Sequence, residues 1–268
     1  MNIFIYIFFS LYFVYLILLA PRIIRKPARM PGKYYAHRGL HDNQSEAPEN
    51  TMAAFRKAVE AGYGMELDVQ LTKDEQVVVV HDFDLKRICG IEKDVDACTY
   101  EELQEYAVCE SAERIPLLTD VLHMVDGQVP LIVEIKYKGD NRVCERVQEL
   151  LDAYQGTYCV ESFHPQVLCW YKKNRPRIRR GQLAMNYLKY TSYKGADKWV
   201  AQHLLTNVMT KPDFIAYDCR SAIEFSLAVT RKLFNCPTFA WTVRSQRELE
   251  ACRPYFDYFI FEGFTPED

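Results

Sequence analysis

The chain has 268 residues, of which 49% are hydrophobic and 26% are charged, and its formal net charge is −3. This slight acidity argues against nucleic-acid binding, which requires a strongly basic face, and favours a small or lipid-like substrate. About 235 residues follow the basic segment near the N-terminus, enough for one large domain with a sizeable core.

The nine cysteines are scattered, odd in number and free of any C-x-x-C pair. Such a pattern is not typical of a disulfide framework or of a zinc site. We therefore expect most cysteines to be reduced, which favours a reducing compartment.

The first segment is apolar. Residues 3–20 carry no charge and would form a helix of about 27 Å, close to the thickness of a bilayer core. This predicts a transmembrane anchor over residues 1–21. A cleaved signal peptide is the alternative, but the segment lacks a basic start and a small-x-small cleavage site.

A basic linker is predicted over residues 22–33. It contains five cationic residues and no acidic one: Arg22, Arg25, Lys26, Arg29 and Lys33. Positive charge on this side of the anchor predicts that the following domain, residues 34–268, is cytoplasmic.

Strand-like and helical patterns alternate through this domain. Eight strand-like runs are expected near residues 34–36, 64–70, 130–136, 158–162, 178–183, 214–217, 238–243 and 258–261. Helices are expected between them, over 50–61, 119–125, 141–153, 165–173, 198–205, 222–233 and 245–252. This alternation predicts the α/β class and a TIM (β/α)8 barrel. Residues 82–114 are expected to form a loop and a short helix outside the barrel.

A hairpin is predicted on top of the barrel. Residues 66–72 and 77–81 are two β-branched-rich runs joined by a polar turn. If the turn is centred between Asp74 and Glu75, Asp68 lies opposite His81 in the ladder. Because residues two apart share a strand face, Glu66, Asp68 and His81 would then point to the same side.

A series of short motifs resembles the signature of the glycerophosphodiester phosphodiesterase family, in the same order along the chain. They are His37-Arg38-Gly39, Pro48-Glu49-Asn50-Thr51, Glu66-Leu67-Asp68, His81-Asp82, Glu134-Ile135-Lys136 and Trp241-Thr242-Val243. The resemblance covers roughly residues 33–262, and the apolar segment makes the chain similar to a membrane-anchored bacterial member. It implies a metal-dependent hydrolase that releases sn-glycerol 3-phosphate and an alcohol.

Three carboxylates are the expected metal ligands: Glu66, Asp68 and Glu134. Mg²⁺ and Ca²⁺ prefer hard oxygen ligands, and no thiolate set competes for this role. Active sites of such barrels lie at the C-terminal ends of the strands, where these residues are predicted. The alternative is that Glu66 and Asp68 form a solvated strand face.

His37 and His81 are the expected proton carriers, because imidazole titrates near neutrality. The resemblance implies that one histidine deprotonates the glycerol 2-hydroxyl and the other protonates the departing alcohol, with a cyclic phosphate between the two steps. Which histidine does which stays open.

Arg38 and Lys136 suit phosphate binding, the alternative being ion pairs with the acids of the site. Trp241 and Phe163 are candidates for the wall of a glycerol slot, or for core residues. Within enzymes, the alternative function is a lysophospholipase D or another phospholipase-type hydrolase on the same barrel. A catalytically silent binding protein is disfavoured, because every histidine and acid of the motifs is present.

Overall fold

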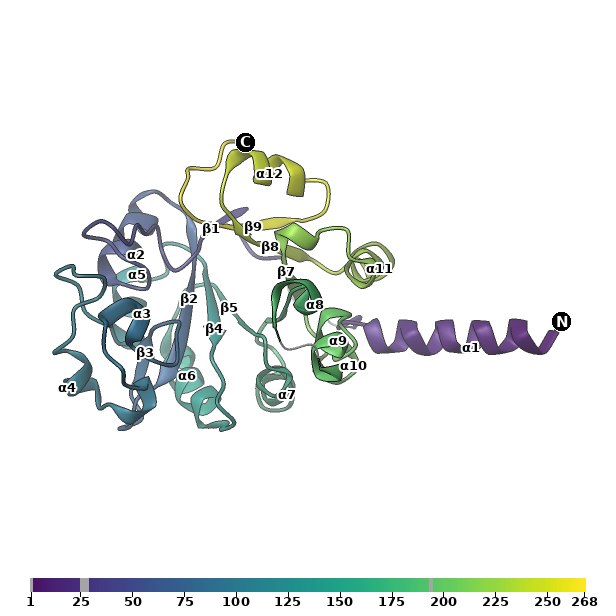
Figure 1. Cartoon of the computed structure of the whole chain (residues 1–268), viewed down its shortest axis with the longest axis horizontal. Helices are drawn as coiled ribbons and strands as arrows, with labels where there is room; N and C mark the ends of the chain where they lie inside the picture. Colours follow the sequence, from purple (N-terminus) through teal and green to yellow (C-terminus); the bar gives the residue numbers. More distant parts are fainter. Residues whose placement is uncertain (1, 25–28, 193–194) are drawn as a thin grey trace.

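The protein is an eight-stranded parallel barrel, seen here in a computed structural model that describes residues 2–24, 29–192 and 195–268. Neighbouring strands pair around the barrel, and β1 closes it by pairing with both β2 and β9 (Figure 1). The strands are β1 (Tyr34–Ala36), β2 (Gly64–Leu71), β4 (Leu131–Ile135), β5 (Tyr158–Ser162), β6 (Arg180–Ala184), β7 (Phe214–Asp218), β8 (Thr238–Val243) and β9 (Tyr258–Phe261). The predicted TIM barrel is confirmed.

Amphipathic helices cover the outside of the barrel. In α6 (Arg142–Ala153), for example, Val143, Val147 and Leu151 are buried at a spacing of one turn. The other covering helices are α2 (Met52–Glu60), α5 (Leu118–Val125), α7 (Pro165–Asn174), α11 (Phe225–Phe234) and α12 (Gln246–Cys252). The helix predicted over 198–205 corresponds to α9 (Ala196–Gln202), which ends earlier than expected. Two further short helices, α8 (Tyr187–Tyr190) and α10 (Asn207–Thr210), flank it and were not predicted.

The barrel interior changes from apolar to acidic along the strands. Ile132 and Cys159 belong to an apolar cluster inside the barrel. Two residues further along the same strands lie Glu134 and Glu161, which share the faces of Ile132 and Cys159 because side chains alternate. The strands therefore end in buried acids above an apolar floor.

The added hairpin is present, but its predicted register is wrong by one residue. Strand β3 (Val77–Val79) runs antiparallel to β2, with Val69 opposite Val79. Asp68 consequently bonds to Val80, whose N–H donates to the Asp68 carbonyl at 2.9 Å, instead of lying opposite His81. The reason is a shorter turn, in which Glu75 adopts a left-handed conformation with φ of 60°.

The segment after the hairpin forms a small cap with its own apolar cluster. It contains the short helix α3 (Lys86–Cys89), the 3-10 helix η1 (Val95–Ala97) and the short helix α4 (Tyr100–Leu103). A capping box at Thr99 and Glu102 begins α4. Val78, Ile88 and Leu103 pack in the cluster. The expected loop and short helix outside the barrel are therefore observed, with two further helical turns.

Helix α1 (Asn2–Leu19) projects away from the barrel (Figure 1). Its last turn is docked: Leu19 is buried, and the Asn207 side chain donates to the Leu19 carbonyl at 3.0 Å. Arg22 continues the contact through an ion pair with Asp213 at 3.1 Å.

The expected transmembrane helix over residues 1–21 is not supported. Among the described residues, no helix combines the length and the apolar character that crossing a membrane requires. Helix α1 is exposed from Ile3 to Val14 and at Ile17, whereas Leu19 at its end is buried. In the predicted linker, residues 25–28 lie outside the described residues.

Candidate active site

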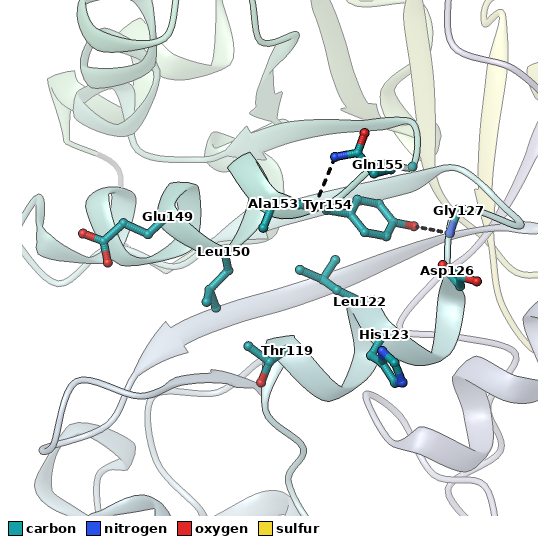
Figure 2. Close-up of a pocket in the computed structure, with 11 residues that line it drawn as sticks. Thr119, Leu122, His123, Asp126, Gly127, Glu149, Leu150, Ala153, Tyr154 and Gln155 are labelled. Carbon is teal, nitrogen blue, oxygen red and sulfur yellow. Dashed lines mark hydrogen bonds between the residues drawn. The ribbon is translucent and has the colours of Figure 1, made fainter.

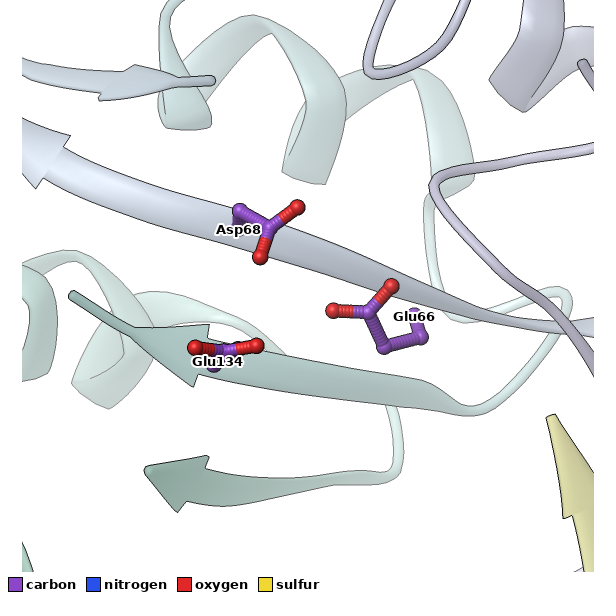
Figure 3. A group of neighbouring side chains, drawn as sticks. All are labelled: Glu66, Asp68 and Glu134. Carbon is purple, nitrogen blue, oxygen red and sulfur yellow. The ribbon is translucent and has the colours of Figure 1, made fainter. Parts of the chain in front are cut away.

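Three buried carboxylates from two neighbouring strands form the centre of the site. Glu66 and Asp68 lie two residues apart on β2, and Glu134 lies beside Asp68 on β4 (Figure 3). One oxygen atom from each lies within 4.8 Å of the others, and all three side chains are buried. The structure therefore brings the three predicted ligands together, and they do not form a solvated strand face.

Two cations partly balance this negative charge. The Lys136 ammonium lies 2.8 Å from Asp68 Oδ1 and 2.6 Å from Glu134 Oε1. The Arg38 guanidinium lies 3.3 Å from Asp68 Oδ2 and bonds to Glu49 at 2.6 Å. Both predicted phosphate ligands are thus ion-paired with acids of the site.

The pKa values of the acids separate according to these contacts. Burial raises the pKa of Glu66 well above its usual range, and the neighbouring Asp68 charge raises it further. Burial acts in the same direction on Asp68, but Lys136 and Arg38 outweigh it and lower the pKa of that carboxyl. Burial also raises the pKa of Glu134, although Lys136 opposes the shift. The three carboxylates therefore carry more negative charge than Lys136 and Arg38 neutralise.

The arrangement fits a hard divalent cation. All three donors are carboxylate oxygens, which Mg²⁺ and Ca²⁺ prefer. Asp68 Oδ1 is buried and accepts no hydrogen bond of good geometry from any described residue, although Lys136 lies near it. A cation at this point would relieve the repulsion that raises the pKa of Glu66.

The turn after β1 fixes the edge of the site. Arg38 adopts a positive φ of 54°, and its backbone N–H donates to Glu66 at 3.1 Å. Gly39 follows with φ of 81°, and a Cβ there would lie 2.9 Å from the Cβ of Ala54 in helix α2. Glycine is therefore required in His-Arg-Gly for both conformation and space.

The loop before α2 supports the acids from the other side. Asn50 donates from Nδ2 to Asp68 Oδ2 at 2.8 Å. Glu49 accepts hydrogen bonds from Arg38 and from Arg87 of the cap. Burial raises the pKa of Glu49, but the bonds from Arg87 and the charge of Arg38 hold it below its usual range. Glu49 and Asn50 therefore hold Arg38 and Asp68 in position at the edge of the site.

Each predicted catalytic histidine has a carboxylate partner on Nδ1. His37 Nδ1 lies 2.5 Å from Glu262, and His81 Nδ1 lies 2.6 Å from Asp82. Because an ionised carboxylate only accepts hydrogen bonds, it places the proton on Nδ1 and leaves Nε2 of a neutral ring as an acceptor. His37 Nε2 lies 3.9 Å from Glu66.

Burial and hydrogen bonding shift the pKa values within these histidine–carboxylate pairs. Burial lowers the pKa of His37 to about 4, although the bond to Glu262 acts in the opposite direction. Burial raises the pKa of Glu262, but the bond from His37 outweighs it and brings the value to about 2. The hydrogen bond from His81 lowers the pKa of Asp82 to about 2. Both carboxylates are thus ionised near pH 7.

A cavity of about 120 Å³ joins these groups. It is lined by six of the eight predicted site residues, namely His37, Arg38, Glu66, His81, Glu134 and Trp241. Phe163 and Trp241 form one wall, with ring centroids 5.3 Å apart in an edge-to-face contact. The Trp241 indole N–H is buried and donates to no described residue, which leaves a hydrogen-bond donor for a ligand.

Two acids of the site were missed in the sequence. Glu161 on β5 lines the cavity, is buried, and has Oε2 without a hydrogen-bond partner among the described residues. Burial, together with the charges of Glu134 and Asp68, raises its pKa well above the usual range. An acid within the apolar run 158–162 was the available signal. Glu262 follows the last strand, and only the fold brings it to His37.

Another cavity lies on the outside of the barrel between α5 and α6 (Figure 2). It measures about 330 Å³, and Tyr154 Oη accepts a hydrogen bond from the Gly127 N–H at 3.1 Å in its wall. Its lining includes His123 but none of the predicted site residues. A substitution at His123 is therefore expected to leave the predicted site unchanged.

Comparison with known proteins identifies the family. The model of the glycerophosphoryl diester phosphodiesterase family matches residues 37–255. This chain belongs to that family. It is a phosphoric diester hydrolase whose substrates are glycerophosphodiesters, and the buried acids form its candidate metal site.

Named relatives within and beyond bacteria support this membership. A glycerophosphodiester phosphodiesterase of Bacillus altitudinis is 36% identical over 61% of this chain and 74% of its own length. A lysophospholipase D of Rattus norvegicus is 38% identical over 53% of this chain. The match covers 48% of that rat protein, so this chain spans about half of it.

Solved structures share the fold. A glycerophosphodiester phosphodiesterase from Thermotoga maritima has a TM-score of 0.66 and 26% identity, covering 87% of this chain and 96% of that one. A phosphodiesterase from Oleispira antarctica, solved with the product sn-glycerol-3-phosphate, has a TM-score of 0.70 and 21% identity. It covers 87% of this chain and 93% of its own.

Changing Glu262 to glutamine should lower kcat, because an amide no longer fixes the proton on Nδ1 of His37. We expect a loss of at least about 10-fold, given that a comparable carboxylate-to-amide change in a serine protease costs about 10⁴-fold. The measurement is steady-state hydrolysis of glycerophosphocholine. Glu267→Gln, at an exposed position of the same C-terminal segment, is the matched control. Equal kcat in both variants would contradict a positioning role for Glu262.

Proposed function

We propose that the enzyme hydrolyses small glycerophosphodiesters to sn-glycerol 3-phosphate and an alcohol. The observation that carries this proposal is the single cavity in which two carboxylate-bound histidines face the buried acids. Its small volume suits a glycerol unit between the Phe163 and Trp241 rings. The unpartnered Trp241 N–H supplies a donor for a glycerol hydroxyl.

Proton transfer in this proposal belongs to His37 and His81. One ring takes the proton from the glycerol 2-hydroxyl, whose oxygen attacks phosphorus and forms a cyclic phosphate. The other ring gives its proton to the oxygen of the departing alcohol as that P–O bond breaks. Water then opens the cyclic phosphate, leaving one hydroxyl on phosphorus and returning the proton to the 2-oxygen.

Glu66, Asp68 and Glu134 would hold one divalent cation, Mg²⁺ or Ca²⁺. When bound, such a cation supplies positive charge to the phosphoryl oxygens. Lys136 and Arg38 lie on two sides of Asp68. We propose that the Lys136 ammonium and the Arg38 guanidinium interact with the phosphate when the metal neutralises the acids.

The products test the proposal directly. Glycerophosphocholine incubated with the protein and Mg²⁺ or Ca²⁺ should give glycerol 3-phosphate and choline, as followed by phosphorus NMR. Release of phosphocholine and glycerol instead would show that the other P–O bond breaks, and would contradict the assignment of the 2-hydroxyl as nucleophile.

The alternative is a lysophospholipase D activity on the same barrel. It is favoured by the rat relative of that name, which is 38% identical to this chain over the matched region. The two activities share the chemistry above and differ in whether an acyl chain is attached to the glycerol. The distinction therefore depends on where an acyl chain could bind.

We also propose that α1 attaches the enzyme to the cytoplasmic face of a membrane. The side chains from Ile3 to Val14 are exposed, including Phe4 at 75% and Phe8 at 66%, and water is a poor environment for so much apolar surface. Basic residues follow the helix, which suits an anionic lipid surface.

Vesicle flotation tests this attachment. The wild-type protein should float with vesicles of phosphatidylcholine and phosphatidylglycerol, whereas a Phe4→Asp, Phe8→Asp double variant should stay at the bottom of the gradient. Leu233→Asp, an exposed apolar position on α11, should float like the wild type. A wild-type protein that fails to float would rule the proposal out.

A further inference from the structure

Exposed apolar side chains of the barrel domain gather beside α1. Four of the large ones lie where α9, α10 and α11 approach the base of that helix. These four residues, which we call the apolar patch, are Trp199, Met209, Ile223 and Phe225. Ile223 is 80% exposed and Phe225 is 63% exposed. Single exposed apolar residues are normal in a soluble domain, whereas a gathered group indicates an interaction surface.

A chain of ring and charge contacts joins α1, α11 and α9. The Phe225 ring stacks on Tyr15 of α1, with the ring centroids 6.2 Å apart. Next to Phe225, the Glu224 carboxylate lies 3.6 Å from His203 Nε2. The His203 ring in turn packs against Trp199, with the centroids 4.6 Å apart. These contacts place the apolar side chains of α9 and α11 beside α1 (Figure 1).

Helix α10 extends the patch along the base of α1. Met209 belongs to α10, which holds the last turn of α1 through the bond from Asn207 to the Leu19 carbonyl. Ile23 and Ile24, just after α1, are exposed as well. The exposed apolar surface of α1 therefore continues onto the barrel domain.

Two lysines add positive charge at the same place. The Lys172 ammonium donates to the Met209 carbonyl, and the Lys211 ammonium donates to the Ala20 carbonyl at 3.0 Å. Burial lowers the pKa of Lys211, and the nearby charge of Lys172 lowers it further. Cations beside an apolar surface suit the head groups of anionic lipids. A tryptophan such as Trp199 suits the boundary between head groups and acyl chains, because its ring is apolar and its N–H is polar.

We propose that the apolar patch is a second membrane contact, whose side chains lie at the head-group boundary of an anionic bilayer while α1 is inserted. The proposal rests on the attachment by α1 proposed above, and it assigns part of the barrel domain to the same surface. A protein partner or a second copy of this chain would need a groove for α1, which projects beside the patch (Figure 1). A bilayer accepts a projecting apolar helix together with the apolar surface at its base.

The two contacts would give the barrel domain one orientation on the bilayer. The base of α1 is fixed to the domain by the buried Leu19 and by the ion pair of Arg22 with Asp213. The helix and the patch therefore meet the lipid as one surface, whose position relative to the strand ends is set by the fold. A flexible tether would instead leave the domain free to rotate in the water above the membrane.

Trp199 provides a direct probe of the contact. Vesicles of phosphatidylcholine and phosphatidylglycerol that carry bromine at the head-group end of their acyl chains quench a tryptophan that touches the lipid. We expect these vesicles to quench the wild-type protein and Trp199→Phe to lose most of that quenching. Trp170 and Trp241 remain in this variant. The Phe4→Asp, Phe8→Asp variant, which should not bind, should show no quenching.

A patch variant tests the energetic contribution. In Ile223→Asp, Phe225→Asp we expect the partition coefficient onto the same vesicles to fall at least about 10-fold, because burial of one large apolar side chain can account for that factor. The matched control is Thr119→Asp, Gln155→Asp, which adds two charges at exposed positions on the other side of the barrel. The control should bind like wild type, and both variants should hydrolyse glycerophosphocholine at the wild-type rate.

The outcomes separate this contact from the attachment by α1. If wild type floats with vesicles but Trp199 is not quenched and the patch variant binds equally well, α1 alone holds the protein and the second contact does not exist. If the patch variant binds lipid normally but loses a dimer that wild type forms in light scattering, the patch is an interface between copies and the proposal is wrong. A wild-type protein that does not float overturns the attachment by α1, and this contact with it.

Discussion

Replacing either His37 or His81 with alanine should lower kcat on glycerophosphocholine by about 10²-fold to 10⁴-fold, the usual contribution of a positioned acid or base. Both rings line the small cavity, and each has an ionised carboxylate on Nδ1. Loss of either ring therefore removes one of the two proton transfers and leaves the acids in place. KM should change much less than kcat, because neither ring is assigned a binding role.

The matched control is His123→Ala, which removes an exposed imidazole from the outer cavity in Figure 2. Its kcat should equal that of wild type. Circular dichroism and thermal unfolding should show that all three variants fold. Full turnover by folded His37→Ala or His81→Ala would show that the protons travel by another route.

The second large effect concerns Glu66. Its pKa is raised in the folded protein by burial and by Asp68, so the ionised group destabilises the cation-free fold near pH 7. The folded state then binds more protons than the unfolded chain, and stability falls as pH rises above the ordinary pKa of a glutamate. Glu66→Gln removes that charge and can still accept the Arg38 N–H.

We therefore expect cation-free Glu66→Gln to unfold at a higher Tm than cation-free wild type at pH 7, with a smaller difference near pH 4. A change of 1 kcal/mol corresponds to about 2–4 °C in a domain of this size. Added Mg²⁺ or Ca²⁺ should raise the Tm of wild type but not that of Glu66→Gln. The exposed Glu105→Gln should behave like wild type. Equal cation responses in the two proteins would exclude Glu66 as a ligand.

Much of the fold could be predicted because its signals are local. Strand-like runs and amphipathic helices follow from the spacing of apolar residues, and the eight strands fall within a few residues of their predicted bounds. The segment between β6 and β7 was harder. There the chain divides into three short helices, none long enough to give a clear period.

The site was predicted from motifs, and its missing parts are those that depend on tertiary contacts. Glu161 lies one strand away from Glu134 in parallel register, a relation that becomes visible only when the barrel closes. Glu262 reaches His37 across the ends of β9 and β1. The hairpin register differed by one residue because Glu75 adopts a conformation that is commoner for glycine.

For the N-terminal segment, hydropathy predicted the helix but not its packing. The hydropathy of this segment correctly predicts an apolar helix. It does not reveal that the last turn of the helix packs against the barrel domain. Leu19 and Ala20 are buried against the barrel, which shortens the exposed apolar length. A single run of apolar residues can thus serve both packing and exposure.

The central claim is that the cluster of Glu66, Asp68 and Glu134 binds a divalent cation on which hydrolysis depends. The most direct measurement is glycerol 3-phosphate release from glycerophosphocholine after treatment with a chelator, followed by add-back of Mg²⁺ or Ca²⁺. We predict that the chelator abolishes release and that one of the two cations restores it to wild-type protein but not to Glu66→Gln. Undiminished release by thoroughly chelated enzyme would contradict the claim.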